Sequence, residues 1–261
     1  MKRTAGILLV LAGVCGAVAY WIDLMNFTDL SKGFSTAGSV WVRYGVLGVL
    51  LAAALLASLM AARRPVGVQR RNLPVAVFSL LCALAQAGLG GIELFAAWAA
   101  KDALTLALGA LSLLCAWWML IQGRFWAADA PKGAPAGGVT MGILGSLYFL
   151  LLTCARFAGN ASSLYRFAQT AQVFAALAAL LFVTVLLRSC FFPESGNGRK
   201  LYFSGMWAFY LCTCFELPQA LARWMAGATQ LGDLAVSAAL ACTGLMGMAC
   251  ALTALGRESD E

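Results

Sequence analysis

Histidine is absent from the chain, which has 261 residues. Without an imidazole, the sequence excludes histidine-ligated haem, the zinc sites that use histidine, and every mechanism with a histidine general base. Metalloproteases with an HExxH motif and membrane serine hydrolases that depend on histidine are therefore excluded as function classes.

Charged residues are also scarce. Asp, Glu, Lys and Arg make up only 11% of the chain, and hydrophobic residues make up 62%, against about 25% and about 45–50% in soluble globular proteins. This composition excludes an ordinary soluble domain, and equally a disordered, collagen-like or coiled-coil chain. The formal net charge of +7 comes from basic residues spread along the chain, so we expect no nucleic-acid partner.

Motifs that would hold a metal, a cofactor or a phosphate are missing as well. The nine cysteines are scattered through apolar runs without a CxxC pair, and buried cysteines of this kind behave as small hydrophobic residues. The chain contains no Walker A or GxGxxG sequence. We therefore expect no metal, no cofactor and no catalytic residues, and so not an enzyme. A lipid-modifying enzyme that uses Glu216 as its general base is a minor alternative.

Long apolar runs are what the sequence does contain. Each has about 18 to 25 residues, enough for a helix to cross a hydrocarbon core of about 30 Å, and none alternates as a β-barrel strand does. The sequence therefore predicts an all-α polytopic integral membrane protein with about eight transmembrane helices. The predicted spans are Ala5–Ile22, Tyr44–Ala62, Val75–Ala99, Ala103–Gln122, Gly138–Phe157, Phe167–Leu187, Leu201–Leu221 and Leu234–Leu255.

The distribution of Lys and Arg predicts the orientation. If the N-terminus is inside, the inner segments carry 12 of the 18 basic residues and the outer segments carry six. By the positive-inside rule this favours both termini in the cytoplasm. An alternative is that the first span is a signal peptide cleaved after the sequence Ala17-Val18-Ala19, which leaves seven spans and an outside N-terminus.

The order of the predicted elements suggests two four-helix halves of one membrane domain, residues 1–131 and 132–261. Each half runs as a span, an outer loop, a span ending in arginine, a basic loop, a span with one glutamate, and a last span. Such halves would form a parallel repeat, with the Pro- and Gly-rich stretch 129–138 as the hinge. The alternative is chance similarity between two halves rich in Leu, Ala and Gly.

Two carboxylates lie inside predicted spans. Ionisable residues are costly in the lipid interior, so their presence there indicates a functional site. At a rise of about 1.5 Å per residue, Glu93 lies about 10 Å and Glu216 about 7 Å outward of the centre of its helix. Helical spacing puts Gln86 on the face of Glu93, and Gln219 on the face of Glu216. The sequence therefore predicts two polar faces in the outer half of the membrane.

Arg156 closes the fifth predicted span and Gln169 lines the outer end of the sixth, so both complete the expected substrate-binding site. We expect an outward-facing polar cavity in which the two glutamates bind a cationic or zwitterionic solute or a proton, and the arginine holds a carboxylate or phosphate. The alternative is that each glutamate pairs with an outer arginine and only fixes helix packing.

These expectations describe a small-solute transporter or channel-like carrier. Its expected partners are the lipid bilayer and a small polar solute or a proton, and a second copy of the chain or another membrane protein is left open. We expect a cell membrane, the bacterial cytoplasmic membrane in particular, because the chain is compact and has no long segment outside the spans. The alternative function is a non-transporting interaction subunit, assembly factor or sensor.

Overall fold

The computed structural model describes residues 2–30, 34–36, 39–60, 71–128, 138–159, 167–192 and 196–255. Nearly all of them are helical. The elements are α1 (Lys2–Phe27), β1 (Thr28–Asp29), β2 (Phe34–Ser35), α2 (Val40–Met60), α3 (Leu73–Ala100), α4 (Ala103–Ala127), α5 (Gly138–Gly159), α6 (Phe167–Phe191), α7 (Gly198–Ala208), the π-helix η2 (Phe209–Glu216), α8 (Leu217–Met225) and α9 (Leu231–Leu255).

Each of the eight predicted spans is helical over the residues that the structure describes. Within the described ranges, seven helices are long and apolar enough to cross a membrane: α1 to α6 and α9. The remaining span corresponds to α7, η2 and α8, which follow one another without a break from Gly198 to Met225. The predicted fold class, an all-α polytopic membrane protein, is confirmed. The two-residue strands β1 and β2 pair antiparallel between α1 and α2.

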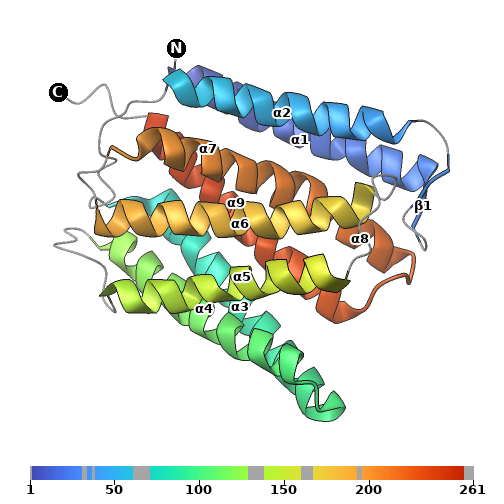
Figure 1. The fold of residues 1–261 in the computed structure, drawn as a ribbon. Helices are drawn as coiled ribbons and strands as arrows, with labels where there is room; N and C mark the ends of the chain where they lie inside the picture. Colours follow the sequence, from blue (N-terminus) through green and yellow to red (C-terminus); the bar gives the residue numbers. More distant parts are fainter. Residues whose placement is uncertain are drawn as a thin grey trace.

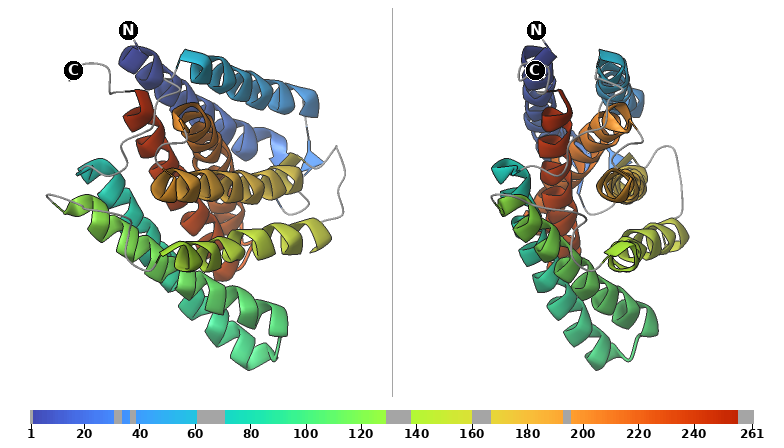
Figure 2. Two further views of the ribbon diagram at one scale, coloured as in Figure 1. Left: turned by 60° about the vertical axis from the view of Figure 1, so that its left-hand side comes forward. Right: turned by 90° about the vertical axis from the view of Figure 1, so that its left-hand side faces the viewer.

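Helix α9 runs through the middle of the bundle, with α1 and α2 on one side of it and α3 and α4 on the other (Figures 1 and 2). Its most apolar stretch is 61% buried, whereas the corresponding stretch of α1 is 17% buried and that of α2 is 28% buried. The first two helices are therefore peripheral, and most of their side chains face outward.

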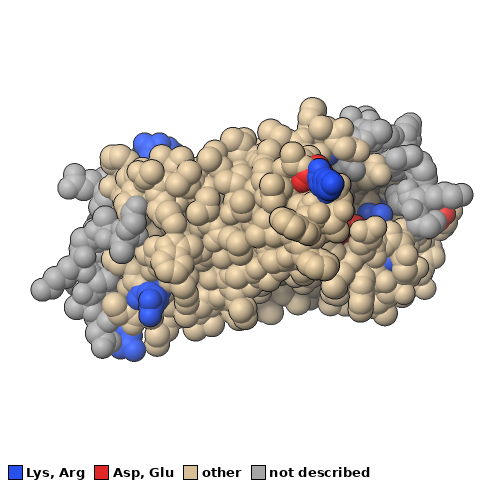
Figure 3. All heavy atoms as spheres, turned by 90° about the horizontal axis from the view of Figure 1, so that it is seen from below, with Lys and Arg blue, Asp and Glu red and all other residues tan. Residues whose placement is uncertain are grey.

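The outward-facing side chains are apolar. Phe95 and Trp98 on α3 are 80% and 83% exposed, and Val49 and Leu56 on α2 are 69% and 66% exposed. On the face seen in Figure 3, the charged side chains gather toward the two ends, and a broad band between them has none. Soluble proteins rarely expose an apolar surface of this extent, so the surface is the one that a lipid bilayer covers.

Helices α3 and α4 form a hairpin whose ends are set by local contacts. At the start of α3, Oδ1 of Asn72 accepts a hydrogen bond from the backbone N–H of Val75. At its end, Lys101 adopts the left-handed conformation with φ 55°, which reverses the chain. Asp102 then caps α4 by accepting from the backbone N–H groups of Leu104 and Thr105, as N-terminal caps commonly do.

The boundary between the two expected halves, at residues 131 and 132, lies outside the described residues, as does nearly all of the expected hinge. The division into two four-helix repeats stays a prediction.

Candidate functional site

The carboxylate of Glu216, at the end of η2, is held by two side chains. Its Oε1 lies 2.8 Å from Nη2 of Arg156 on α5, and it accepts a second hydrogen bond of 2.8 Å from the hydroxyl of Ser237 on α9. Nη1 of Arg156 donates to the backbone carbonyl of Gln172 on α6 over 2.6 Å. One ion pair therefore joins η2, α5, α6 and α9.

This ion pair is deeply buried. The side chain of Glu216 is fully buried and that of Arg156 is 13% exposed. The second carboxylate oxygen, Oε2 of Glu216, is also buried, and no described residue donates a hydrogen bond to it. A buried carboxylate oxygen has room for more than one hydrogen bond, so the pair keeps unused acceptor capacity.

The backbone that carries Glu216 is unusual. η2 is a π-helix of eight residues, and π-helical turns are rare in proteins and frequent at functional sites. Pro218 follows two residues after it and lacks an N–H group, so the carbonyl of Cys214 has no α-helical donor. The proline therefore weakens the backbone bonding within the π-helical segment, at whose end Glu216 contacts Arg156 on α5 and Ser237 on α9.

The side chain of Gln219 makes its own hydrogen bonds, with partners other than those of Glu216. Its Nε2 donates to the carbonyl of Ala168 on α6 over 3.1 Å, and its Oε1 accepts from the hydroxyl of Tyr20 on α1 over 3.2 Å. Gln169, the next residue along α6, is half-buried, three positions before the Gln172 carbonyl that Arg156 contacts. The predicted residues Glu216, Arg156, Gln219 and Gln169 thus lie on helices that meet at one end of the bundle.

Glu93 and Gln86 lie on the buried face of α3, as their spacing predicts. Oε1 of Gln86 accepts from the hydroxyl of Ser112 on α4 over 2.8 Å. Nε2 of Gln86 and Oε2 of Glu93 are buried and have no hydrogen-bond partner in the described parts of the chain. Within those parts, no arginine or lysine forms an ion pair with Glu93, so the predicted alternative of a glutamate–arginine pair applies to Glu216 alone.

Tyr148 on α5 connects the surroundings of the two glutamates. It is fully buried and lies within electrostatic range of both Glu93 and Arg156. Its hydroxyl, like the two glutamate Oε2 atoms, lacks a hydrogen-bond partner among the residues that the structure describes. Sequence reasoning missed this tyrosine, because a single Tyr in an apolar run carries no signal of its depth or direction.

A cavity of about 410 Å³ lies between α1 and α2, at the end of the bundle where β1 and β2 pair. Its polar members are Tyr20, Asp23, Ser39 and Arg43, and Phe215 closes its inner side. The sequence did not indicate this cavity. The available signal was a carboxylate near the end of one span and an arginine near the start of the next, two charges at similar membrane depth.

In the described ranges, no group of three or more Cys, Asp and Glu residues is arranged so that it could hold a metal ion. The sulfur of Cys212 contacts the carbonyl of Ala175 instead.

The comparisons with known proteins add no relative to this description. No protein-family model, no curated protein and no solved structure matches the chain.

Proposed function

We propose that the protein is a carrier of a small zwitterionic or cationic solute, which binds at the pair of Glu216 and Arg156. The observation that supports this proposal is the buried ion pair with one carboxylate oxygen left without a hydrogen bond. A charged pair inside a membrane bundle is costly to keep, and apolar residues of similar volume often replace such pairs without loss of stability.

A zwitterion fits this pair by exchange of partners. The guanidinium of Arg156 presents a planar fork of donors to a carboxylate or phosphate, and Glu216 accepts from an ammonium group. When the solute is bound, each of the two protein charges faces an opposite charge of the solute. When the solute is absent, Glu216 and Arg156 neutralise each other. Neither state leaves an unpaired charge inside the bundle, which is the costly condition.

Glu93, Gln86 and Gln169 take supporting roles in this proposal. Glu93 is a second buried carboxylate in electrostatic range of Tyr148, and it serves as a further position for a cation or a proton. The unpartnered amide of Gln86 and the side chain of Gln169 contribute polar contacts to the solute. The proposed orientation has both termini in the cytoplasm of a bacterium, with Glu216 in the outer half of the membrane.

A charge swap separates this function from a purely structural pair. The double variant Glu216→Arg with Arg156→Glu retains an ion pair, so it should fold, whereas its solute site has the two charges exchanged. Thermal stability of the purified protein is measured with a panel of amino acids, betaines, amines and carboxylates. A ligand at 100 times its dissociation constant stabilises the folded state by about 2.7 kcal/mol.

We expect that at least one zwitterion or amine of the panel raises the melting temperature of the wild type and leaves that of the folded swap variant unchanged. Asp233→Asn, at an exposed acidic residue in the first turn of α9, is the matched control and should retain the response. Uptake of the same solute into proteoliposomes then tests transport. A wild type without response to any solute contradicts the proposal and favours the non-transporting membrane subunit.

A further inference from the structure

The cavity between α1 and α2 is apolar over most of its wall. Its lining consists largely of small and hydrophobic side chains, among them Gly16, Ala19, Val46 and Phe215. A volume of about 410 Å³ is within the range of small-molecule sites, about 300–1,000 Å³, which are mostly apolar with a few placed polar groups.

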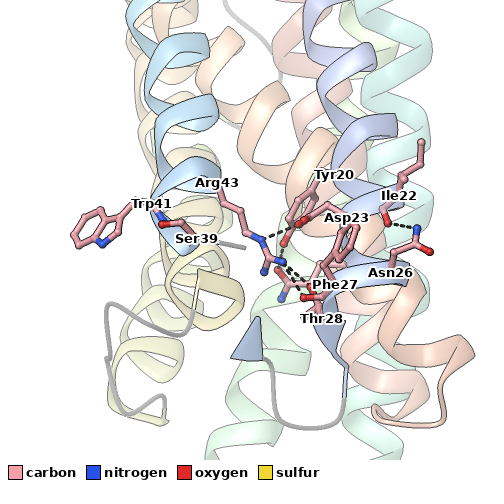
Figure 4. Close-up of polar contacts among 10 residues, drawn as sticks. Tyr20, Ile22, Asp23, Asn26, Phe27, Thr28, Ser39, Trp41 and Arg43 are labelled. Atoms are coloured by element: carbon pink, nitrogen blue, oxygen red, sulfur yellow. Dashed lines mark hydrogen bonds and ion pairs between the residues drawn. The ribbon is translucent and has the colours of Figure 1, made fainter. Parts of the chain in front are cut away.

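The polar groups of this cavity are gathered at its end near β1. Arg43 on α2 reaches across to α1, where its Nε lies 2.7 Å from Oδ2 of Asp23 (Figure 4). Nη2 of Arg43 donates to the hydroxyl of Thr28 over 2.8 Å. Oδ2 of Asp23 is ion-paired, yet no described residue donates a well-aligned hydrogen bond to it. The carboxylate therefore has acceptor capacity left.

The two charges differ in exposure. The side chain of Arg43 is 8% exposed and that of Asp23 is 33% exposed. Because Oδ2 is buried against Arg43, an approaching molecule meets the remaining, exposed part of the Asp23 side chain, whose charge the arginine neutralises in part. This arrangement favours a ligand that is neutral overall and presents an ammonium group.

The cavity faces the membrane rather than the interior of the bundle. Val42 and Val46, which line it, are 65% and 46% exposed. Among the spanning helices α1 is the least buried, and α2 and α5 come next with equal burial. Trp41, beside the charged end, is 64% exposed, and exposed tryptophans of this kind lie at the level of the lipid headgroups. The apolar part of the cavity is then at the depth of the acyl chains.

From these observations we infer that the cavity between α1 and α2 holds the headgroup and part of one acyl chain of a membrane phospholipid, with the chain along Gly16, Val46 and Phe215 and an ammonium group on Asp23. The lipid enters sideways from the bilayer. Charge complementarity favours a zwitterionic headgroup with N–H donors over an anionic one, because Nε and Nη2 of Arg43 are engaged by Asp23, Thr28 and the carbonyl of Phe27.

This lipid site is built from other residues than the proposed solute site. Neither Glu216 nor Arg156 is among the residues that line the cavity. The charge-swap variant of Glu216 and Arg156 should therefore bind lipid as the wild type does, and a failure of the solute proposal leaves the lipid site in place.

The test is native mass spectrometry of the purified protein in detergent with equal amounts of phosphatidylethanolamine and phosphatidylglycerol. The wild type should retain phosphatidylethanolamine in preference. Val46→Trp fills the cavity and should abolish that adduct, whereas Val49→Trp, on the same helix, 69% exposed and outside the lining, should retain it. Asp23→Asn removes a charged contact and should lower phosphatidylethanolamine binding about tenfold or more.

Two results would overturn the inference. One is equal binding of the two phospholipids by the wild type, since the headgroup argument then fails. The other is an unchanged phosphatidylethanolamine adduct on a folded Val46→Trp protein, since the lipid is then held elsewhere on the surface. The melting temperatures of both tryptophan variants are measured first, so that a loss of binding is read only from folded protein.

Discussion

The hydroxyl of Tyr20 on α1 donates a hydrogen bond of 3.2 Å to Oε1 of Gln219 on α8. Tyr20 lines the cavity between α1 and α2, and Gln219 stands three positions after Glu216. The ring of Tyr20 also packs against Phe215, with ring centroids 5.1 Å apart. Through this contact the peripheral first helix is attached to the helix that carries the buried ion pair.

Tyr20→Phe should destabilise the protein. The variant removes the donor and leaves Oε1 of the fully buried Gln219 without its hydrogen bond, which costs about 1–3 kcal/mol. The free energy of unfolding in detergent measures the loss. Because α1 is bound to the bundle partly by this contact, proteolysis between α1 and α2 should also become faster.

Tyr148→Phe is the matched control for that variant. Tyr148 is as deeply buried as Tyr20, but its hydroxyl has no partner among the described residues. Removal of an unsatisfied buried hydroxyl is neutral or stabilising. Equal destabilisation by the two substitutions would contradict the assignment of the hydrogen bond to Tyr20.

Single neutral substitutions of the ion pair should be severe. Arg156→Gln leaves a buried carboxylate with only the hydroxyl of Ser237 as a donor, and loss of one partner of a buried pair costs about 3–5 kcal/mol. The double variant Glu216→Gln with Arg156→Gln removes both charges and should lose less than the sum of the single variants. A double-mutant cycle on unfolding free energies measures this coupling.

If the changes in unfolding free energy of the two single variants simply sum to that of the double variant, the ion pair is contradicted. Substitutions at residues without contact are additive to within about 0.5 kcal/mol. Glu93→Gln, at a carboxylate without an ion pair in the described parts of the chain, is the matched control. It changes a buried carboxyl group that forms no ion pair with a described residue, and it should not couple to Arg156→Gln by more than that amount.

The spanning helices could be predicted from the sequence because their signal is local. The run expected at Ala103–Gln122 begins at the same residue as α4 and ends five residues early, where Arg124 interrupts the apolar pattern and Trp126 is nevertheless buried. Length and hydropathy are properties of each segment by itself, and the bilayer sets a minimum length for it.

The pairing of side chains could be predicted only in part. Counting residues along the spans placed both Glu216 and Arg156 in the outer half of the membrane. Whether they touch depends on the rotation of η2 and on the distance between helices, and the π-helix changes that rotation in a way that periodicity of 3.6 residues does not reveal. The contact of Arg43 with Asp23 escaped prediction for the same reason, since nothing local shows that α1 and α2 face each other there.

Gly247→Ala should destabilise the contact of α9 with α7. A Cβ atom at residue 247 would lie 2.8 Å from the carbonyl oxygen of Gly205, and backbone atoms cannot move aside as a flexible side chain does. Gly91→Ala on α3 meets nothing within 4 Å and should stabilise its helix by up to about 1 kcal/mol. Opposite signs in the change of melting temperature are expected, and equal signs would contradict the close approach of α7 and α9.

Asp102 is expected to contribute a pH-dependent part of the stability at the connection between α3 and α4. The hydroxyl of Thr105 and the backbone N–H of Leu104 donate to its carboxylate and hold its pKa below the usual value of 3.8. Since the pKa is lower in the folded state, this stabilisation is fully present above pH 3.8 and is lost as the pH falls through the folded pKa. Asp102→Asn keeps a capping side chain but does not titrate. The difference in melting temperature between wild type and Asp102→Asn should therefore be constant around neutral pH. Below pH 3.8 the wild type should lose stability relative to the variant. A difference that does not depend on pH at all would rule out this contribution of the carboxylate.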